Sequence, residues 1–356
     1  MTTTASTAAV DALVDWDLAL AAATRLTRPG PQVSRAEAAD VVAVLRADAR
    51  RSTPLVEQVT GLSTQPGEDV LVVDRPGWVR ANVEAFRTLL APVVEEAAGR
   101  RGGSLAPLVG AVGSRVTGAE MGSLLAFLSS RVLGQYDVFH SGGGRLLLVA
   151  PNVVHAEREL AADPADFRLW VCLHEETHRV QFTASPWLRD HLTARVRALV
   201  SDLLGEPGAV LERVLDAVGR LPDVVRGDAA TGLLDVVQTP EQRRALAEVT
   251  AVMSLLEGHA DVVMDEVGPS VIPSVATIRR QFSRRRSGRS APDRLLRRLL
   301  GLDAKMRQYT DGAVFVRSVV DDVGTTGFNR VWDSPDTLPT PEEIADPAGW
   351  VARVHG

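Results

Sequence analysis

The sequence has 356 residues, of which 45% are apolar and 24% are charged, a composition typical of a globular protein with a substantial core. It contains one cysteine and 7 histidines, which excludes an intrachain disulfide and leaves histidines and carboxylates for any metal site. The net charge of −6 argues against a dedicated nucleic-acid-binding protein. Acidic residues interrupt the apolar positions near the N-terminus, so we expect neither a signal peptide nor a membrane helix, and a cytoplasmic location.

Helical periodicity dominates the first part of the chain. Ser34 and Glu37 match a capping box, and the segment Ser-Thr-Pro at 52–54 resembles a second helix start. Asp74 is placed to cap a third helix, and Gly134 is typical of a helix end. The expected helices cover residues 34–45, a short segment from 52, 74–90 and about 119–133.

A short strand is expected after the glycine tract at 142–144. Residues 145–150 form an apolar run that Pro151 ends, which favours a strand. Helical patterns resume at about Val153. We therefore expect a mainly α fold of the α+β class, in which a helical array accompanies a small sheet. The expected regions are 1–139 and 140–356, joined in one compact unit.

An arginine-rich segment spans residues 279–298. It holds nine arginines against one acid, Asp293, and we expect a solvated, exposed loop between helices. The segment could instead contact an acidic partner. Nucleic acid is a less favoured partner, because Phe282 is the single aromatic residue there.

The motif that carries chemistry lies in a helix expected to begin at Asp163, an N-cap, and to end before Pro186. His174 and His178 are four residues apart, so their rings project from one side of the helix and can bind one zinc ion. Glu175 lies beside them, where it can reach a zinc-bound water. This is the H-E-x-x-H pattern of zinc metallopeptidases.

Two alternatives to this interpretation need to be weighed. The two histidines could be core residues that hydrogen-bond to backbone carbonyls, which is costly unless each polar atom finds a partner. A third histidine ligand within the next six residues would define a metzincin. Gln181 and Ala184 occupy those positions, which excludes that class.

A third ligand is expected from a second long helix over residues 241–265. Glu257 and Asp261 are four residues apart on its largely apolar side, where acids are rare unless paired or metal-bound. Glu257 would ligate zinc. Asp261 would accept a hydrogen bond from the N–H of a ligating histidine, for which His174 is the preferred candidate. Gly258 would let another backbone approach closely. The alternative is an exposed acidic face.

Three other residues are weaker candidates for a role in the metal site. His259 should point to a different helix face and serve in packing or as a partner of a ligand, with a ligand role as the alternative. His140 lies beside the glycine tract and could reach the cleft. Cys172 precedes His174 by two residues, so it should point away from the ligands and be a small core residue.

The combination of H-E-x-x-H with a later E-x-x-x-D resembles the glutamate zincins of the thermolysin type. More closely, the chain resembles an actinobacterial zincin-like family of hydrolases associated with deazaflavin-coenzyme biosynthesis. The matching stretches are residues 14–17, 74–79, 133–137, 173–182, 255–265 and 328–332. The resemblance implies a mostly helical, zincin-like fold, in which the strand at 145–150 is the edge strand of the small sheet. There it would border the cleft and pair with an extended substrate.

The expected activity is hydrolysis of a peptide or another amide by zinc-activated water, with zinc on His174, His178 and Glu257 and with Glu175 as general base. Tyr309 is the candidate donor to the oxyanion, and the alternative is an ordinary tyrosine on a helix surface. The alternative is a zincin-like scaffold that binds zinc and a partner but has no peptidase activity.

Overall fold

The structure is a computed structural model, and it describes residues 14–64, 70–100, 111–140, 142–205, 239–287 and 302–356. The chain divides into two compact units, residues 1–189 with 266–281, and residues 190–265 with 282–356. Each unit is described by itself. The predicted division of the chain at residues 139/140 stays a prediction.

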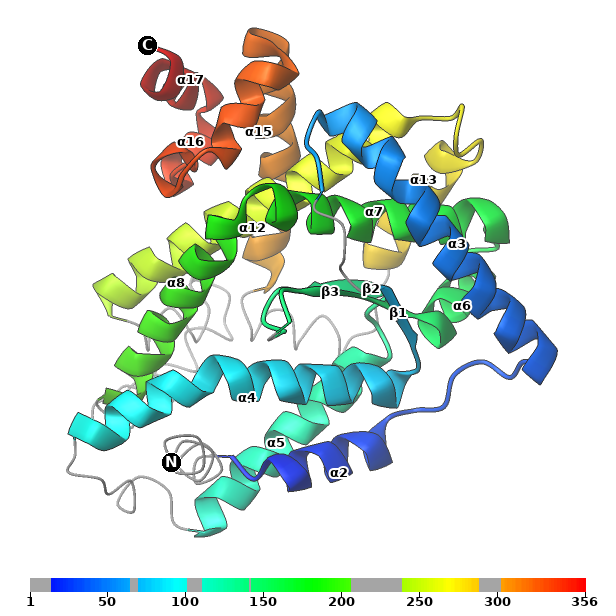
Figure 1. The fold of residues 1–356 in the computed structure, drawn as a ribbon, viewed down its shortest axis with the longest axis vertical. Coiled ribbons are helices and arrows are strands. Elements are labelled where there is room, and N and C mark those ends of the chain that lie inside the picture. Colours follow the sequence, from blue (N-terminus) through cyan, green and yellow to red (C-terminus); the bar gives the residue numbers. More distant parts are fainter. Residues whose placement is uncertain (1–13, 65–69, 101–110, 141, 206–238, 288–301) are drawn as a thin grey trace, which may run out of the picture. The chain divides into compact units, whose positions relative to one another are not determined.

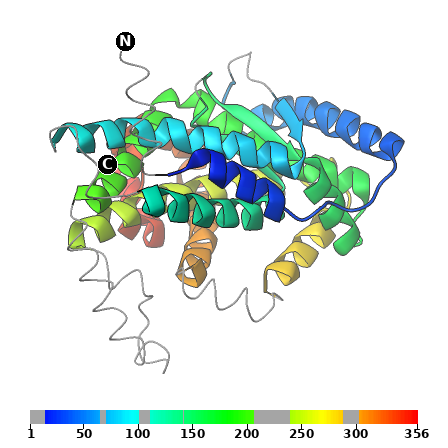
Figure 2. The same ribbon diagram turned by 90° about the horizontal axis from the view of Figure 1, so that it is seen from below.

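The first unit combines long helices with a small sheet, as the sequence predicts, so the mainly helical α+β class is confirmed. Its helices are α2 (Trp16–Leu26), α3 (Arg35–Thr60), α4 (Arg75–Arg100), α5 (Ala111–Ser129), α6 (Ala150–Glu159) and α7 (Pro164–Ala184). Its strands are β1 (Val70–Val73), β2 (Gly134–Asp137) and β3 (Arg145–Val149). Figures 1 and 2 show α2, α4 and α5 side by side.

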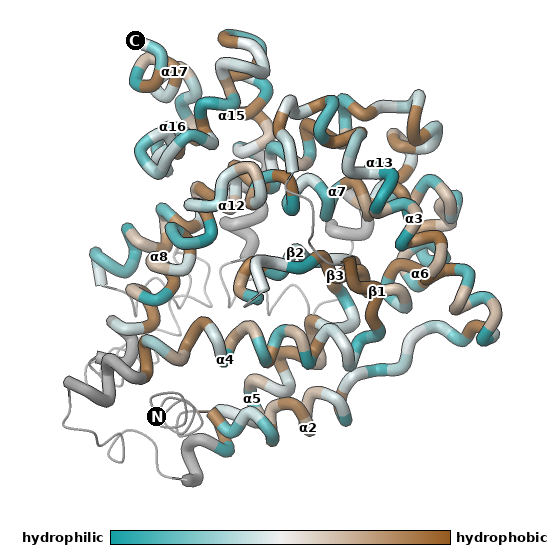
Figure 3. The backbone as a smooth tube through the Cα atoms, in the orientation of Figure 1, coloured by the Kyte–Doolittle hydropathy of each residue, from teal (hydrophilic) through white to brown (hydrophobic). Residues whose placement is uncertain are grey.

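The sheet has the order β1-β3-β2, so β3 is its central strand. β3 pairs in parallel with β1 and antiparallel with β2, and every residue of β3 is buried. Figure 3 shows the hydrophobic character of β1 and β3. The strand predicted at 145–150 is therefore confirmed, but its predicted place at the edge is wrong. Both of its edges are already paired, so it cannot add a substrate strand.

Several predicted helix boundaries are also wrong. α4 continues to Arg100 and not only to residue 90, and α5 begins at Ala111 and not at about 119. Gly134 does not end α5, which stops at Ser129, but begins β2. α3 does not end near Leu45 but continues through Pro54 to Thr60. Packing gives the reason for the longer α3. One buried stripe runs along the whole helix, and the helix packs against α7, which offsets the backbone hydrogen bond that proline cannot make. The residues of that stripe are Val41, Leu45, Ala49, Ser52, Val56 and Thr60.

The second unit contains most of α8 (Pro186–Gly205) and α12 (Pro240–Val267), together with α15 (Leu302–Phe328), α16 (Pro341–Ala345) and α17 (Pro347–His355). Two short 3-10 turns, η1 (Asn329–Trp332) and η2 (Pro335–Thr337), link α15 to α16. The predicted helix over 241–265 is confirmed. Thr239 and Gln242 exchange side-chain hydrogen bonds with each other's backbone N–H at its start, a capping arrangement that fixes where α12 begins.

Helices α12 and α15 cross at two glycines. A methyl group added at Gly258 would overlap the backbone of Gly312 and Ala313, and one added at Gly312 would overlap the backbone of Ser254. The predicted close backbone approach at Gly258 is thus confirmed. An ion pair between Arg317 and Asp265, 2.6 Å long, joins the same two helices further along.

The arginine-rich segment is partly helical. α13 (Val275–Ser287) contains Arg279, Arg280 and the three arginines at 284–286, so the prediction of a loop is wrong for the first nine residues. Arginine is a good helix former, and Val275 and Ile278 are buried at the start of this helix. Residues 288–298 lie outside the described residues. None of the described helices combines the length and the apolar character that crossing a lipid bilayer requires.

Candidate metal centre and catalytic helix

Helix α7 begins and ends where the sequence predicts. Asp163 caps it, and its carboxylate accepts hydrogen bonds from the backbone N–H groups of Ala165 and Asp166, each 3.0 Å long. Between residues 169 and 183 every side chain is buried except those of His174 and His178, which are half-buried. This part of the helix is therefore surrounded by protein, and solvent reaches it mainly at the two histidines.

The two histidine rings form a compact pair. Their centroids lie 4.8 Å apart with an interplanar angle of 86°, and the ring of Trp170 stacks on His174 at 6.2 Å. The Nδ1 atom of His178 lies 3.0 Å from Oε1 of Gln181, one turn further along α7. The four-residue spacing thus brings both imidazoles to one place, as predicted.

The side chain of Glu175 lies between α7 and strand β2. Only 7% of it is exposed, and its Cγ and Cδ atoms occupy the space that any side chain at position 134 would need. Position 134 therefore requires glycine because a larger residue would overlap Glu175. Gly134 does not end a helix, contrary to the prediction from the sequence. The edge strand and the central glutamate of the motif are held against each other.

The opposite face of α7 is fixed by a buried ion pair. Arg179 donates from Nε to Glu176 at 2.9 Å, and its Nη2 donates to the hydroxyl of Thr53 in α3 at 3.1 Å. Glu176 is fully buried, and removing either partner of such a pair costs on the order of 3–5 kcal/mol. This contact sets the rotation of α7 about its axis, and with it the direction of the two histidines.

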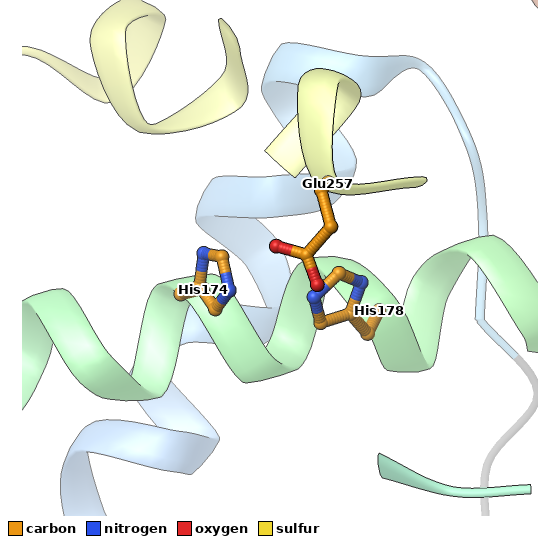
Figure 4. Close-up of side chains that lie close together, drawn as sticks. All are labelled: His174, His178 and Glu257. Atoms are coloured by element: carbon orange, nitrogen blue, oxygen red, sulfur yellow. The ribbon is translucent and has the colours of Figure 1, made fainter. Parts of the chain in front are cut away.

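Within the residues that the structure describes, one group of three His, Cys, Asp or Glu side chains could hold a metal ion. It consists of His174, His178 and Glu257, whose ligand atoms lie within 4.8 Å of one another. Figure 4 shows the carboxylate of Glu257 pointing toward the two rings. Glu257 is half-buried, whereas its neighbours Leu256 and Gly258 are buried. The three predicted ligands are brought together.

The structure says less about the predicted roles of the other candidate residues. Asp261 is half-buried on α12, one turn beyond Glu257, and its bond to His174 stays a prediction. Tyr309 belongs to α15, one turn before Gly312, and its side chain lies outside the described part of the structure, so its role stays a prediction. His259 is 4% exposed and packs against Phe328 and Trp332, with centroids 5.3 Å from each, which agrees with the expected packing role.

Two remaining predictions concern His140 and Cys172. His140 lies 4.0 Å from the carboxylate of Glu84 on α4, and it does not join the metal group. Cys172 is fully buried, with its sulfur 3.6 Å from the backbone oxygen of Leu45. Burial raises the pKa of the Cys172 thiol well above its usual range, so the thiolate that a nucleophile requires does not form near neutral pH.

The strand that contacts Glu175 also carries a buried carboxylate. Asp137 of β2 is almost fully buried and pairs with the guanidinium of Arg145 at 3.0 Å. Burial raises the pKa of Asp137, although the charge of Arg145 opposes that shift. The pair fastens β2 to β3, so the strand that touches Glu175 is anchored.

Sequence reasoning missed the contacts of Gln181 and of Gly134. A glutamine three residues after a ligating histidine faces the same side of the helix, and this spacing could have pointed to Gln181. Nothing local to Gly134 pointed to Glu175, because the two are 41 residues apart in sequence (175 − 134).

Comparisons with known proteins identify the family of this chain. The sequence matches the zincin-like metallopeptidase family over residues 14–351, and the chain therefore belongs to that family. A crystal structure of a protein from Chloroflexus aurantiacus, described as a candidate hydrolase with a novel fold, shares 32% sequence identity. The TM-score is 0.67, with 96% of this chain and 99% of that chain covered. No curated protein matches the chain.

Proposed function

We propose that the protein is a zinc-dependent metallohydrolase that cleaves a peptide or another amide bond. The observation that carries the proposal is the convergence of His174, His178 and Glu257 within 4.8 Å, next to a buried glutamate at position 175. Family membership and the hydrolase description of the Chloroflexus aurantiacus protein support the same class of reaction.

The donor set fits zinc. Two imidazole nitrogens and one carboxylate oxygen are a usual set for catalytic zinc, which keeps a further position open. Ligand atoms on one tetrahedral zinc ion lie about 3.4 Å apart, given bonds of about 2.1 Å. Atoms within 4.8 Å of one another can reach one ion through small rotations of these half-buried side chains. The absence of thiolates from the site agrees with the single, inert Cys172.

Glu175 would serve as the general base. When bound, zinc supplies a Lewis acid that makes water nucleophilic near neutral pH and polarises a substrate carbonyl. The carboxylate of Glu175 takes a proton from the attacking water and later delivers it to the leaving amine. Its contact with Gly134 restricts its rotamers, so the base is held in position before substrate binds.

The substrate would bind along β2 and not along β3. Among the described strands β2 pairs with β3 alone, so the backbone groups of its other edge can pair with an extended peptide. Gly134 and Tyr136 face α7, where they meet Glu175 and Phe182. A peptide on this edge would run beside the glutamate, as the reaction requires.

Tyr309 remains our candidate for the donor that stabilises the oxyanion. It lies on α15 one turn before Gly312, and Gly312 contacts α12 next to Glu257. The backbone of α15 is thus held beside the helix that carries the third ligand. A phenol hydroxyl can donate a hydrogen bond to an oxygen as negative charge develops on it.

The test is a cleavage screen on a peptide library, with simple amides added and with zinc measured in the same preparations. We expect about one zinc per chain and cleavage in the wild type. Glu175→Gln should keep zinc and lose about 10²–10⁴-fold in rate, because it removes the base. Glu159→Gln, the same change at an exposed glutamate of α6, is the control and should cleave normally.

The screen also separates hydrolase from scaffold. A protein that loads zinc and cleaves nothing would support the alternative of a partner-binding scaffold. A protein prepared with ample zinc that contains none would contradict both interpretations.

A further inference from the structure

One contact in the site has no role in the chemistry proposed above. The Nδ1 atom of His178 lies 3.0 Å from the side-chain oxygen of Gln181. An amide oxygen accepts hydrogen bonds and cannot donate them. In this arrangement the proton of the neutral imidazole is therefore on Nδ1, and the other ring nitrogen, Nε2, carries the lone pair.

A metal ion needs that lone pair. Neutral imidazole binds through its unprotonated nitrogen, so the hydrogen bond at one nitrogen decides whether the other can be a ligand. If the proton were on Nε2, His178 could not offer that atom to a metal until the proton had moved. The bond to Gln181 selects the competent tautomer in advance.

The position of Gln181 suits this task. It lies three residues after His178 on α7, a spacing that places two side chains on the same side of a helix. Gln181 is fully buried, so its amide group is shielded from water and from the fluctuations of an exposed side chain. A neutral acceptor there also adds no charge to the enclosed helix.

We propose that Gln181 is a positioning residue, which holds His178 with its proton on Nδ1 so that Nε2 can bind zinc. The inference rests on the proposed function, because it assumes that His178 is a zinc ligand. From the sequence we expect Asp261 to accept a hydrogen bond from His174. We assign the same kind of role to Gln181, with His178 as the donor. Gln181 itself touches neither zinc nor substrate.

The experiment compares three variants by their zinc dissociation constants, measured by competition with a chelating dye. Gln181→Met keeps the length of the side chain and removes the oxygen, and it should bind zinc about 10–100-fold more weakly, the effect typical of losing a partner of a ligating histidine. Gln181→Glu restores an oxygen that can only accept, and it should bind zinc within about 3-fold of wild type. Gln242→Met makes the same exchange at a buried glutamine that caps α12, and it should leave the affinity unchanged.

A second measurement needs no metal. In the metal-free protein, two-bond proton–nitrogen correlation spectra of the histidine rings report which nitrogen carries the proton. The wild type should show His178 protonated on Nδ1, and Gln181→Met should shift the proton toward Nε2. A purely structural role would lower the thermal midpoint of Gln181→Met without changing this spectrum.

The outcomes are distinguishable. Equal zinc affinity and equal spectra in the wild type and Gln181→Met would overturn the role of Gln181 and leave the proposed function standing. A wild type that binds no zinc would overturn the proposed function itself. If Gln181→Met does not fold, a 10-fold or greater loss of zinc affinity in the folded Gln181→Glu overturns the inference, and retained affinity supports it.

Discussion

Helices α7 and α12 contribute to the proposed metal centre in different ways. α7 supplies two donors, His174 and His178, whose mutual geometry follows from helical spacing alone. α12 supplies one donor, Glu257, whose distance from the histidines depends on how a segment 79 residues further along the chain (257 − 178) folds back. Local sequence can therefore establish two of the three donors, and the position of the third depends on long-range packing.

The two helices are also fixed by different contacts. α7 is held on one side by the Glu176–Arg179 pair with α3, and on another by the contact between Glu175 and Gly134. α12 is held by its glycine crossing with α15 and by an ion pair to the same helix. α7 thus meets a glycine of β2, and α12 meets a glycine of α15, at contacts that an added methyl group would disturb.

The largest effect should come from removing the ligands of the two helices separately. His178→Ala should weaken zinc binding by more than about 100-fold, beyond the range seen when only a partner of a ligand is lost. Glu257→Gln keeps an oxygen without its charge, so it should weaken binding less, by about 10–100-fold. Chelator competition measures both constants. Glu266→Gln, an exposed change on the same helix, is the control, and unchanged affinity in Glu257→Gln would show that α12 supplies no ligand.

An intermediate effect is expected from Gly134→Ala. The new methyl group would overlap Glu175, so the base must move, and a displacement of about 1 Å can lower kcat about 100-fold. Zinc affinity should stay within about 3-fold of wild type, because the three atoms nearest to the added methyl group all belong to Glu175.

The control for this change is Gly118→Ala, which creates a similar overlap with the backbone of Asp15 between α2 and α5. It should cost about 1–3 kcal/mol of stability and leave kcat per folded molecule unchanged. Equal losses of kcat in the two variants would mean that Gly134 acts through stability and not through the base.

The smallest effect is expected from Gly258→Ala, which separates α12 from α15. Overpacking at this crossing should lower the free energy of unfolding by about 1–3 kcal/mol, measured by urea denaturation. Gly312→Ala acts on the same contact, so the double variant should lose less than the sum of the two single losses. Strictly additive losses would show that the two glycines do not share one contact.

Much of this protein is determined by its sequence alone. The bounds of α7 follow from Asp163, Pro164 and Pro186, since a cap and two prolines act on the adjacent backbone. The spacing of His174, Glu175 and His178 fixes their shared surface for the same local reason. The course of α12 and the need for a glycine at 258 were likewise predicted from the apolar pattern and the residue type.

Only the tertiary structure decides the order of the strands and the neighbours of the site. An apolar run such as 145–150 looks the same at the centre or the edge of a sheet, because pairing involves backbone groups that every residue carries. Gly134 resembles a helix stop until Glu175 is seen to fill the space beside it, and Pro54 resembles a helix start until the packing of α3 on α7 is known. Short-range patterns set the shape of each element, whereas contacts between distant elements set which neighbour each face and edge receives.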